Sequence, residues 1–402
     1  MPHYDVVIAG AGPAGSASAC RLARAGLRVA MVDRASFPRD KVCSEYMSPE
    51  GVRHLAALGA LERVEAAGGQ AIRGTMVHAP RGSRLTGLFA RAGHAPFRDT
   101  GLSVPRRILD QVLVDSALAA GADLLERNVV LDLLRDGPNV RGLLVRGAGG
   151  RIRELTARLT IGADGLRSVV ARALGRRRIG PLRRYALVAH LTDVTGLADT
   201  AEMHVSARGY VGLNPLGNGI ANVALVLPHE AMRPARGRIR QFFFEALAQF
   251  PEVAERTRSS RVVRDVLVSG PFDAWSSRIT APGAVLVGDA ADFFDPFTGE
   301  GICAAFRGAE LVEAALLPSL TRGIAPAAAA LRAYRRARRR AFLGKWTVER
   351  AIGYAMLAPA LFDGAVARLE RHGLAHTLIG VTGDFVPPRA VLNPLFLSRV
   401  MF

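Results

Sequence analysis

Residues 4–15 read YDVVIAGAGPAG, an apolar run of strand length followed by three glycines in the pattern G-x-G-x-x-G. Residues 13–25 then have helical character. In a strand–turn–helix unit, Gly10 allows the tight turn, Gly12 lets the backbone approach a pyrophosphate, and Gly15 lets the helix pack closely on the strand. The pattern therefore predicts a dinucleotide-binding turn. A structural unit with a chance glycine pattern is the alternative.

The helix after this turn begins at Pro13 and Ala14, and its free N–H groups predict an anion site for a diphosphate. A second apolar strand over residues 28–32 ends in Asp33, which is followed by Arg34. An acid 18 residues after the last glycine is where a carboxylate would hydrogen-bond the ribose hydroxyls of an adenosine. Together with the three glycines, the predicted contacts of the dinucleotide are therefore Pro13, Ala14, Asp33 and Arg34.

The composition is that of a large globular protein. The chain has 402 residues, which predicts about two domains, and half of the residues are apolar. The three cysteines, Cys20, Cys43 and Cys303, are far apart and lack metal-ligand spacing. This favours a reducing compartment and predicts neither a disulfide framework nor a metal site. The chain opens directly on its first strand, so no signal peptide is expected and a cytoplasmic location is predicted.

The net charge of +18 comes almost entirely from arginines spread along the chain. No nucleic-acid-binding motif accompanies it, so no nucleic acid partner is expected. The exception to the even spread is residues 332–345, where six arginines and Lys345 crowd one predicted helix. This segment is interpreted either as a solvated helix face or as a patch for an anionic membrane or partner, which would be a peripheral membrane contact.

A polar loop follows the second strand and reads FPRDKVCSEYMSP over residues 37–49. It resembles the F-P-R-x-K-x-C-G-E segment of the geranylgeranyl-reductase-like flavoproteins, a branch of the p-hydroxybenzoate hydroxylase superfamily of FAD enzymes. The resemblance implies that FAD is the cofactor and that Arg39 and Cys43 lie near it. Ser44 stands where the family usually has glycine. A buried small side chain without contact to the cofactor is the alternative for Cys43.

Two further segments resemble the same superfamily. VPRRILD, residues 104–110, matches V-x-R-x-x-L-D, and GADGLRS, residues 162–168, matches G-A-D-G-x-x-S. The resemblance implies that Arg106 reaches the FAD phosphates or ring, with a surface arginine as the alternative. It implies that Asp164 ties its loop to the cofactor region, with a purely structural turn as the alternative.

The last landmark is GAVLVGDAA, residues 283–291, followed by DPFTGEGI, residues 295–302. In the superfamily the aspartate of the G-D pair bonds the ribityl chain of FAD. The loop after it opens a helix whose N-terminal dipole can stabilise negative charge on a reduced flavin. The residues that the resemblance assigns to cofactor binding here are Gly288, Asp289, Pro296, Gly299, Gly301 and Ile302.

These features predict an α/β fold, a Rossmann-like FAD-binding domain of the p-hydroxybenzoate hydroxylase type with an inserted β-sheet substrate domain and a C-terminal helical segment. The predicted boundaries assign residues 1–70, 100–178 and 276–325 to FAD binding, residues 71–99 and 179–275 to the substrate domain, and residues 326–402 to the helical region. Within the substrate domain, Tyr210 and Pro215 fit the reductases' Y-x-W-x-F-P segment, but Gly212 and Asn214 replace its two aromatics.

The sequence favours an enzyme that uses FAD with NADPH or NADH as electron donor and acts on a hydrophobic small molecule. The preferred activity is a monooxygenase that hydroxylates an aromatic or polyketide-like substrate with molecular oxygen through a flavin C4a-hydroperoxide. Such an enzyme needs a dry pocket and, for phenols, a base. The polar candidates are His190, His204 and Tyr210, each of which could be an ordinary sheet residue, and Cys43 is the further catalytic candidate.

Two alternatives to hydroxylation stay open. Reduction of an alkene in a lipid or prenyl substrate is supported by the Cys43 loop and by residues 299–301. A flavin-bound binding protein without turnover is the non-enzyme alternative. Halogenation is disfavoured because Trp275 and Trp346 are the only tryptophans and cannot form a W-x-W-x-I-P motif.

Overall fold

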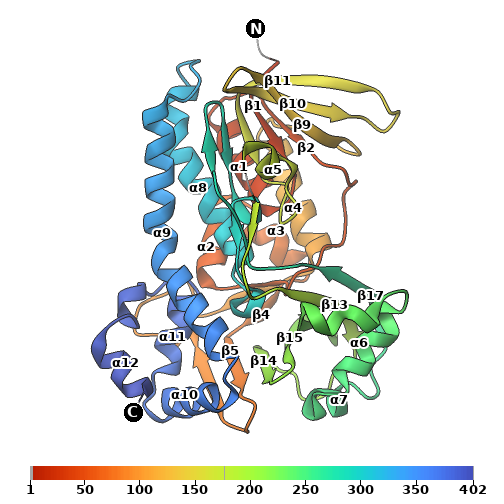
Figure 1. Cartoon of the computed structure of the whole chain (residues 1–402), viewed down its shortest axis with the longest axis vertical. Coiled ribbons are helices and arrows are strands. Elements are labelled where there is room, and N and C mark those ends of the chain that lie inside the picture. The colour runs from red at the N-terminus through yellow and green to blue at the C-terminus, as the bar shows by residue number, and fades with distance from the viewer. Residues whose placement is uncertain (1–2, 176, 402) are drawn as a thin grey trace.

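The computed structural model describes residues 3–175 and 177–401 and is built around two large sheets (Figure 1). The first sheet has a parallel centre with the strand order β20-β11-β1-β2-β8, and β19 pairs antiparallel with β20 at one edge. A hairpin of β9 and β10 extends from β11. The strands are β1 (Tyr4–Ala9), β2 (Val29–Val32), β8 (Asp123–Leu125), β9 (Val129–Asp136), β10 (Asn139–Arg146), β11 (Ile152–Gly162), β19 (Thr280–Ala281) and β20 (Ala284–Leu286).

Alternation along β1 explains how this sheet is covered on both faces. Val6 and Ile8 belong to a large core with the helices on one face, whereas Val7 and Ala9 belong to a second core beneath the β9–β10 hairpin and α5. The helices of this half are α1 (Pro13–Arg24), α2 (Pro49–Ala57), α3 (Leu61–Ala66), α4 (Arg106–Ala119), α5 (Val169–Leu174) and α8 (Gly301–Leu320). The predicted strand–turn–helix unit at the start of the chain is present.

The second sheet has seven strands in the order β17-β13-β16-β15-β14-β5-β6. They are β5 (Gly74–His78), β6 (Arg84–Leu88), β13 (Arg184–Thr192), β14 (Thr200–Ser206), β15 (Gly209–Gly217), β16 (Ile220–Pro228) and β17 (Val262–Ser269). Two chain segments thus build one sheet, because β5 joins β14 in parallel. Helices α6 (Ile239–Leu247) and α7 (Pro251–Arg256) cover one face.

The C-terminal helices cover the other face of the second sheet. They are α9 (Ala328–Ala355), α10 (Pro359–Arg371), α11 (Ala375–Thr382) and α12 (Pro394–Met401). In Figure 1, α9 runs beside α8, and α10 and α11 lie at the lower end of the molecule. Both α10 and α11 contact β6. None of the helices in the described part of the chain is both long and apolar enough to cross a bilayer.

Small sheets connect the two halves. One contains β3 (Tyr46–Met47), β7 (Gly101–Ser103) and β4 (Gln70–Ile72), and the other contains β12 (Arg177–Ile179), β18 (Ala274–Ser276) and β21 (Asp292–Phe293). Short 3₁₀ turns η3 (Gly288–Ala290) and η4 (Pro296–Thr298) lead into α8. The architecture confirms the predicted fold class, a Rossmann-like domain with an inserted sheet and a helical C-terminus.

The basic segment of α9 was interpreted as a solvated helix face or as a patch for an anionic membrane or partner. Two of its residues fit neither interpretation. Arg338 is buried and pairs with Asp292 at 2.6 Å, and Lys345 is buried 3.8 Å from Glu300. A solvated face or a membrane patch is therefore wrong for these two cations, because each is turned inward toward a carboxylate. The other arginines between residues 332 and 340 are exposed.

Candidate flavin site

The glycine turn is as tight as its sequence requires. Gly10 has φ of +93°, and a Cβ added to Gly15 would lie 1.9 Å from the Gly10 carbonyl oxygen. Any larger residue at position 15 would therefore separate α1 from β1. A Cβ on Gly12 would lie 3.5 Å from a guanidinium nitrogen of Arg39 and 3.8 Å from one of Arg106. Two cations thus face the turn and the start of α1, as a diphosphate would need.

Asp33 lies where its spacing predicts, at the end of β2 beside the glycine turn. Its carboxylate accepts a hydrogen bond from the backbone N–H of Ala11 at 2.9 Å and another from Ala35 at 2.9 Å. Arg39 is 3.9 Å away, and Arg34 is exposed at the edge. The carboxylate is therefore held rigidly at the position where ribose hydroxyls are expected.

Arg106 is only 7% exposed, so the surface alternative for this residue is wrong. Its Nε and Nη2 atoms donate to the two carboxylate oxygens of Asp110 at 2.7 and 2.8 Å. Arg39 Nη1 lies 3.1 Å from the same carboxylate, yet this buried nitrogen has no hydrogen-bond acceptor among the described residues. A buried guanidinium donor without an acceptor, beside the glycine turn, fits an anionic cofactor such as FAD.

The Gly288–Asp289 pair lies against the first motif. Gly288 has φ of +59°, and a Cβ there would approach Ala14 to 3.0 Å, so η3 packs on the first turn of α1. Burial raises the pKa of Asp289, and Lys41 and Arg106 act in the opposite direction. Motifs almost 280 residues apart in the chain are thereby brought to one place.

The carboxylate of Asp164 forms hydrogen bonds with residues close to it in the chain. It accepts from the Ser168 hydroxyl and from the Val169 N–H at 2.7 Å, and Ser168 in turn caps α5. The backbone next to Asp164 also packs against Gly10, whose added Cβ would lie 2.5 Å from the Ala163 carbonyl oxygen. These contacts order a turn that borders the dinucleotide-binding turn.

The loop that contains Cys43 is held by hydrogen bonds from polar side chains of the second sheet, namely Asn214, Asn222 and His190, which we call the clamp. Asn222 donates to the Cys43 carbonyl at 2.9 Å and to Glu45 at 2.8 Å, and Asn214 donates to the Ser44 carbonyl at 3.0 Å. Asn214 thus has a positional role in place of the aromatic residue of the reductase motif. Burial raises the pKa of Cys43, which keeps it a thiol.

His190 is part of the same clamp. Its Nε2 lies 2.6 Å from Glu45, a completely buried carboxylate that also accepts from the Arg106 N–H at 2.8 Å. Burial raises the pKa of Glu45, but its interactions with His190, Arg106 and Arg264 together outweigh burial and lower the pKa of the carboxyl. Glu45, Asn214 and Asn222 were not predicted as site residues. Two asparagines inside otherwise apolar strands were the available signal.

Tyr210 positions the loop before α8. Its hydroxyl donates to Asp295 at 2.6 Å, and Asp295 also pairs with Arg184 at 2.8 Å. Burial raises the pKa of Tyr210 well above its usual value, so it stays a neutral phenol. Of the predicted catalytic residues, Cys43 lies in the loop over residues 37–49, and His190 contacts the same loop through Glu45. Tyr210 supports the loop before α8. His204 lies on the opposite face of the sheet.

A buried group that was not predicted lies at the start of α8. Glu300 is 4% exposed, accepts from the Ser48 hydroxyl at 3.1 Å and lies 3.8 Å from Lys345 Nζ. Burial raises the pKa of Glu300 to about 7, an effect that Lys345 only partly offsets. Burial also raises the pKa of Glu349 to about 7. A single cavity is lined by Gly288, Asp289, Glu300, Gly301, Lys345 and Glu349.

The fold and these motifs define a dinucleotide-binding oxidoreductase of the flavoprotein class. The chain belongs to the FAD binding domain family, whose model matches residues 3–345. The residues present fit this cofactor: the glycine turn, Asp33, Arg39, Arg106 and Asp289 converge. The protein is therefore an FAD-dependent oxidoreductase.

Curated relatives of similar length are reductases. The chain is 31% identical over 311 residues to a menaquinone reductase from Mycolicibacterium smegmatis, covering 74% of this chain and 72% of that protein. It is 30% identical over 310 residues to a digeranylgeranylglycerophospholipid reductase from Methanothrix thermoacetophila, covering 75% of each.

Solved structures share the fold across nearly the whole chain. A flavoprotein/dehydrogenase from Cytophaga hutchinsonii has a TM-score of 0.84 at 21% identity and covers 99% of this chain and 96% of that one. A myxobacterial chondrochloren halogenase has a TM-score of 0.82 at 22% identity, covering 99% and 95%. A geranylgeranyl bacteriochlorophyll reductase-like protein from Thermoplasma acidophilum has a TM-score of 0.77 at 21% identity, covering 99% and 98%.

Asp33→Ala is expected to lower FAD occupancy strongly. The variant loses a carboxylate positioned for ribose and two charge-assisted hydrogen bonds that order the turn, each worth about 1.5–3 kcal/mol. The flavin-to-protein absorbance ratio of the purified protein measures the effect, and Asp40→Ala, an exposed acid in the next loop, is the control. Full flavin content in Asp33→Ala would exclude the ribose role.

Proposed function

We propose that this FAD-dependent oxidoreductase reduces a carbon–carbon double bond in the isoprenoid chain of a lipid or quinone, with NADH or NADPH as the electron donor. The two relatives described above are named for a quinone and a lipid that both carry isoprenoid chains. The substrate is thus a hydrophobic small molecule, as the sequence also predicts.

The observation that carries this proposal is the buried acid at the start of α8. Saturation of an isolated double bond requires a hydride and a proton, and FAD, when bound, supplies the hydride. Because the pKa of Glu300 is raised to about 7, this buried carboxyl group holds a proton near neutral pH at the wall of the cavity. It follows Gly299 and precedes Gly301, two of the residues assigned to flavin contact.

Lys345 takes part in the charge balance around Glu300. Burial lowers the pKa of its ammonium, but the charges of Asp384, Glu300 and the other acidic groups around it together outweigh burial and raise this pKa. Lys345 is one cation among several carboxyl groups. Carboxylates that it does not compensate repel one another, so some of these carboxyl groups stay protonated. Glu349, whose pKa is also about 7, lines the same cavity.

The groups considered for phenol hydroxylation are occupied by other partners. His190 is engaged by buried Glu45, and the Tyr210 hydroxyl donates to Asp295. Each therefore holds a loop in place, whereas a general base needs a free acceptor directed at the substrate. This difference favours reduction over the hydroxylation preferred from sequence alone.

An anaerobic half-reaction tests the proposal. Chemically reduced enzyme is mixed under argon with an isoprenoid quinone or a polyprenyl lipid, and with its fully saturated counterpart as control. We expect the flavin to be reoxidised only by the unsaturated compound, and the product to gain two hydrogen atoms by mass spectrometry. Reoxidation only with oxygen, with a product that gains one oxygen atom, would establish a monooxygenase instead. No substrate-dependent reoxidation under either condition would favour a flavin-bound binding protein.

A further inference from the structure

Three ligand-type side chains meet on the second sheet, on the face that α6 and α7 cover. His78 ends β5, and Glu202 and His204 lie two residues apart in β14. The parallel register places His204 opposite His78. On the next strand, Glu202 and His204 face Leu213 and Val211, which pack in the α6–α7 core. The group thus lies on the opposite face from Asn214 and the flavin-side clamp.

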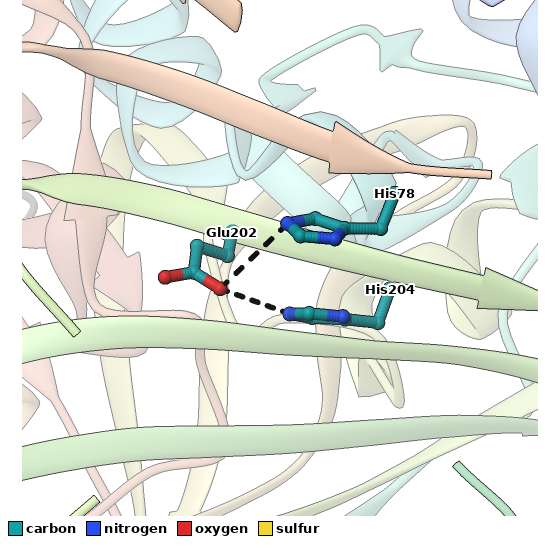
Figure 2. A group of neighbouring side chains, drawn as sticks. All are labelled: His78, Glu202 and His204. Atoms are coloured by element: carbon teal, nitrogen blue, oxygen red, sulfur yellow. Dashed lines mark hydrogen bonds and ion pairs between the residues drawn. The ribbon is translucent and has the colours of Figure 1, made fainter. Parts of the chain in front are cut away.

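The three side chains present nitrogen and oxygen atoms to one point. Figure 2 shows the two imidazole rings stacked with a nitrogen of each directed at the Glu202 carboxylate. The ring centroids are 4.1 Å apart, and Glu202 Oε2 lies 2.9 Å from His204 Nε2 and 4.0 Å from His78 Nε2. The ligand atoms all lie within 4.8 Å of one another, and each residue is less than 9% exposed.

These separations bracket those of a tetrahedral zinc site. Bonds of about 2.1 Å from zinc to nitrogen and oxygen place neighbouring ligand atoms about 3.4 Å apart. The two observed nitrogen–oxygen distances lie about half an ångström on either side of this value. Small tilts of the stacked rings would let both nitrogen lone pairs converge on one ion.

The surroundings supply the supporting contacts that metal-binding histidines use. Glu252 Oε2, from α7, lies 3.3 Å from Nδ1 of His78 and 3.8 Å from Nδ1 of His204. With Nε2 of each histidine on an ion, each Nδ1–H would face this carboxylate, which is the arrangement that orients metal-binding histidines. His78 Nδ1 is buried and makes no hydrogen bond within the described residues.

The remaining neighbours are compatible with an ion. Arg256 donates to the two oxygens of Glu202 at 2.5 and 3.0 Å, which keeps this carboxylate ionised. Oε2 gains a lone pair for an ion once the proton that it shares with His204 is displaced. The Met76 sulfur lies 3.1 Å from His78 Nε2 and is a further ligand-type atom beside the group. Imidazole, carboxylate and thioether together suit zinc better than calcium or magnesium.

We propose that His78, Glu202 and His204 form a zinc site in which the ion replaces the proton shared between His204 and Glu202. The ion would tie β5 to β14, the only contact by which residues 74–88 join the sheet through strand pairing in the described chain. The role is structural, since the group lies across the sheet from the flavin site. Sequence spacing gave no sign of it, because His78 is more than 120 residues from its partners.

Metal analysis of the FAD-loaded protein tests the site. After treatment with a chelator and dialysis against Zn²⁺, we expect about one zinc per chain by mass spectrometry, and added Zn²⁺ should raise Tm by about 2 °C or more. Glu252→Gln removes a supporting partner and should weaken zinc binding by about 10–100-fold. His78→Gln removes a ligand and should weaken zinc binding by more than this. His229→Gln, which changes an exposed histidine, should bind zinc as the unchanged protein does.

Cobalt substitution gives a readout that is independent of stability. The unchanged protein should show visible d–d absorption of a tetrahedral Co²⁺ site, and His78→Gln with full flavin content should not. Zinc retained equally by His78→Gln, or no stoichiometric zinc in the unchanged protein, would overturn the assignment.

Discussion

Glu300→Gln is expected to lower the rate of alkene reduction by about 100-fold or more while FAD stays bound. Proton donation by a positioned acid contributes about 10²–10⁴-fold, and glutamine has the shape of the acid without its transferable proton. Single-turnover reoxidation of the reduced variant by the polyprenyl substrate measures the loss. Glu349→Gln is the matched control, a second acid of the same cavity with a pKa of about 7, and should slow turnover much less.

The pH profile identifies the same group by a different route. The acid form of Glu300 dominates below its pKa of about 7, so reoxidation by the alkene should be fastest there and fall about tenfold per pH unit above it. The carboxyl pKa is raised above the ordinary 4.5, so its contribution to stability is present below pH 4.5 and lost as pH rises through 7. Both dependences should flatten in Glu300→Gln. An unchanged rate and profile in this variant would remove Glu300 from the reaction.

Arg106→Ala is expected to destabilise the protein by up to about 3–5 kcal/mol and to release FAD. The completely buried carboxylate of Asp110 loses its bidentate partner and keeps only Arg39, whose Nη1 lies 3.1 Å away, and breaking a buried ion pair costs up to that much. It also removes one of the two guanidinium groups beside Gly12. Urea denaturation and flavin content measure the two effects.

Arg107→Ala is the control for this substitution. Arg107 is the next residue in α4, but its side chain is 58% exposed and its nearest acid, Asp40, is 3.9 Å away. Its replacement should change the free energy of unfolding by less than about 0.5 kcal/mol. Equal stability and equal flavin content in the two variants would make Arg106 dispensable for both the fold and the cofactor.

The sequence was sufficient for the fold class and for the cofactor. The reason is that these features depend on short-range geometry: a positive φ at Gly10, the close approach of Gly15 to the strand, and an acid at the end of β2 are each set within one strand–turn–helix unit. The Gly288–Asp289 turn is local in the same way. Such motifs can be recognised in a sequence because each of their residue types meets one steric or electrostatic requirement at a fixed spacing.

The tertiary structure decided what the polar residues of the second sheet and of α9 do. His190 looked like a base and is bound to Glu45, and Lys345 looked like part of a basic face and is buried beside Glu300. Glu300 becomes a candidate acid only because packing removes it from water, and His78 meets His204 only through the pairing of β5 with β14. Burial and strand pairing join residues far apart in the chain, so no local pattern reports the partner that sets each group's charge and proton affinity.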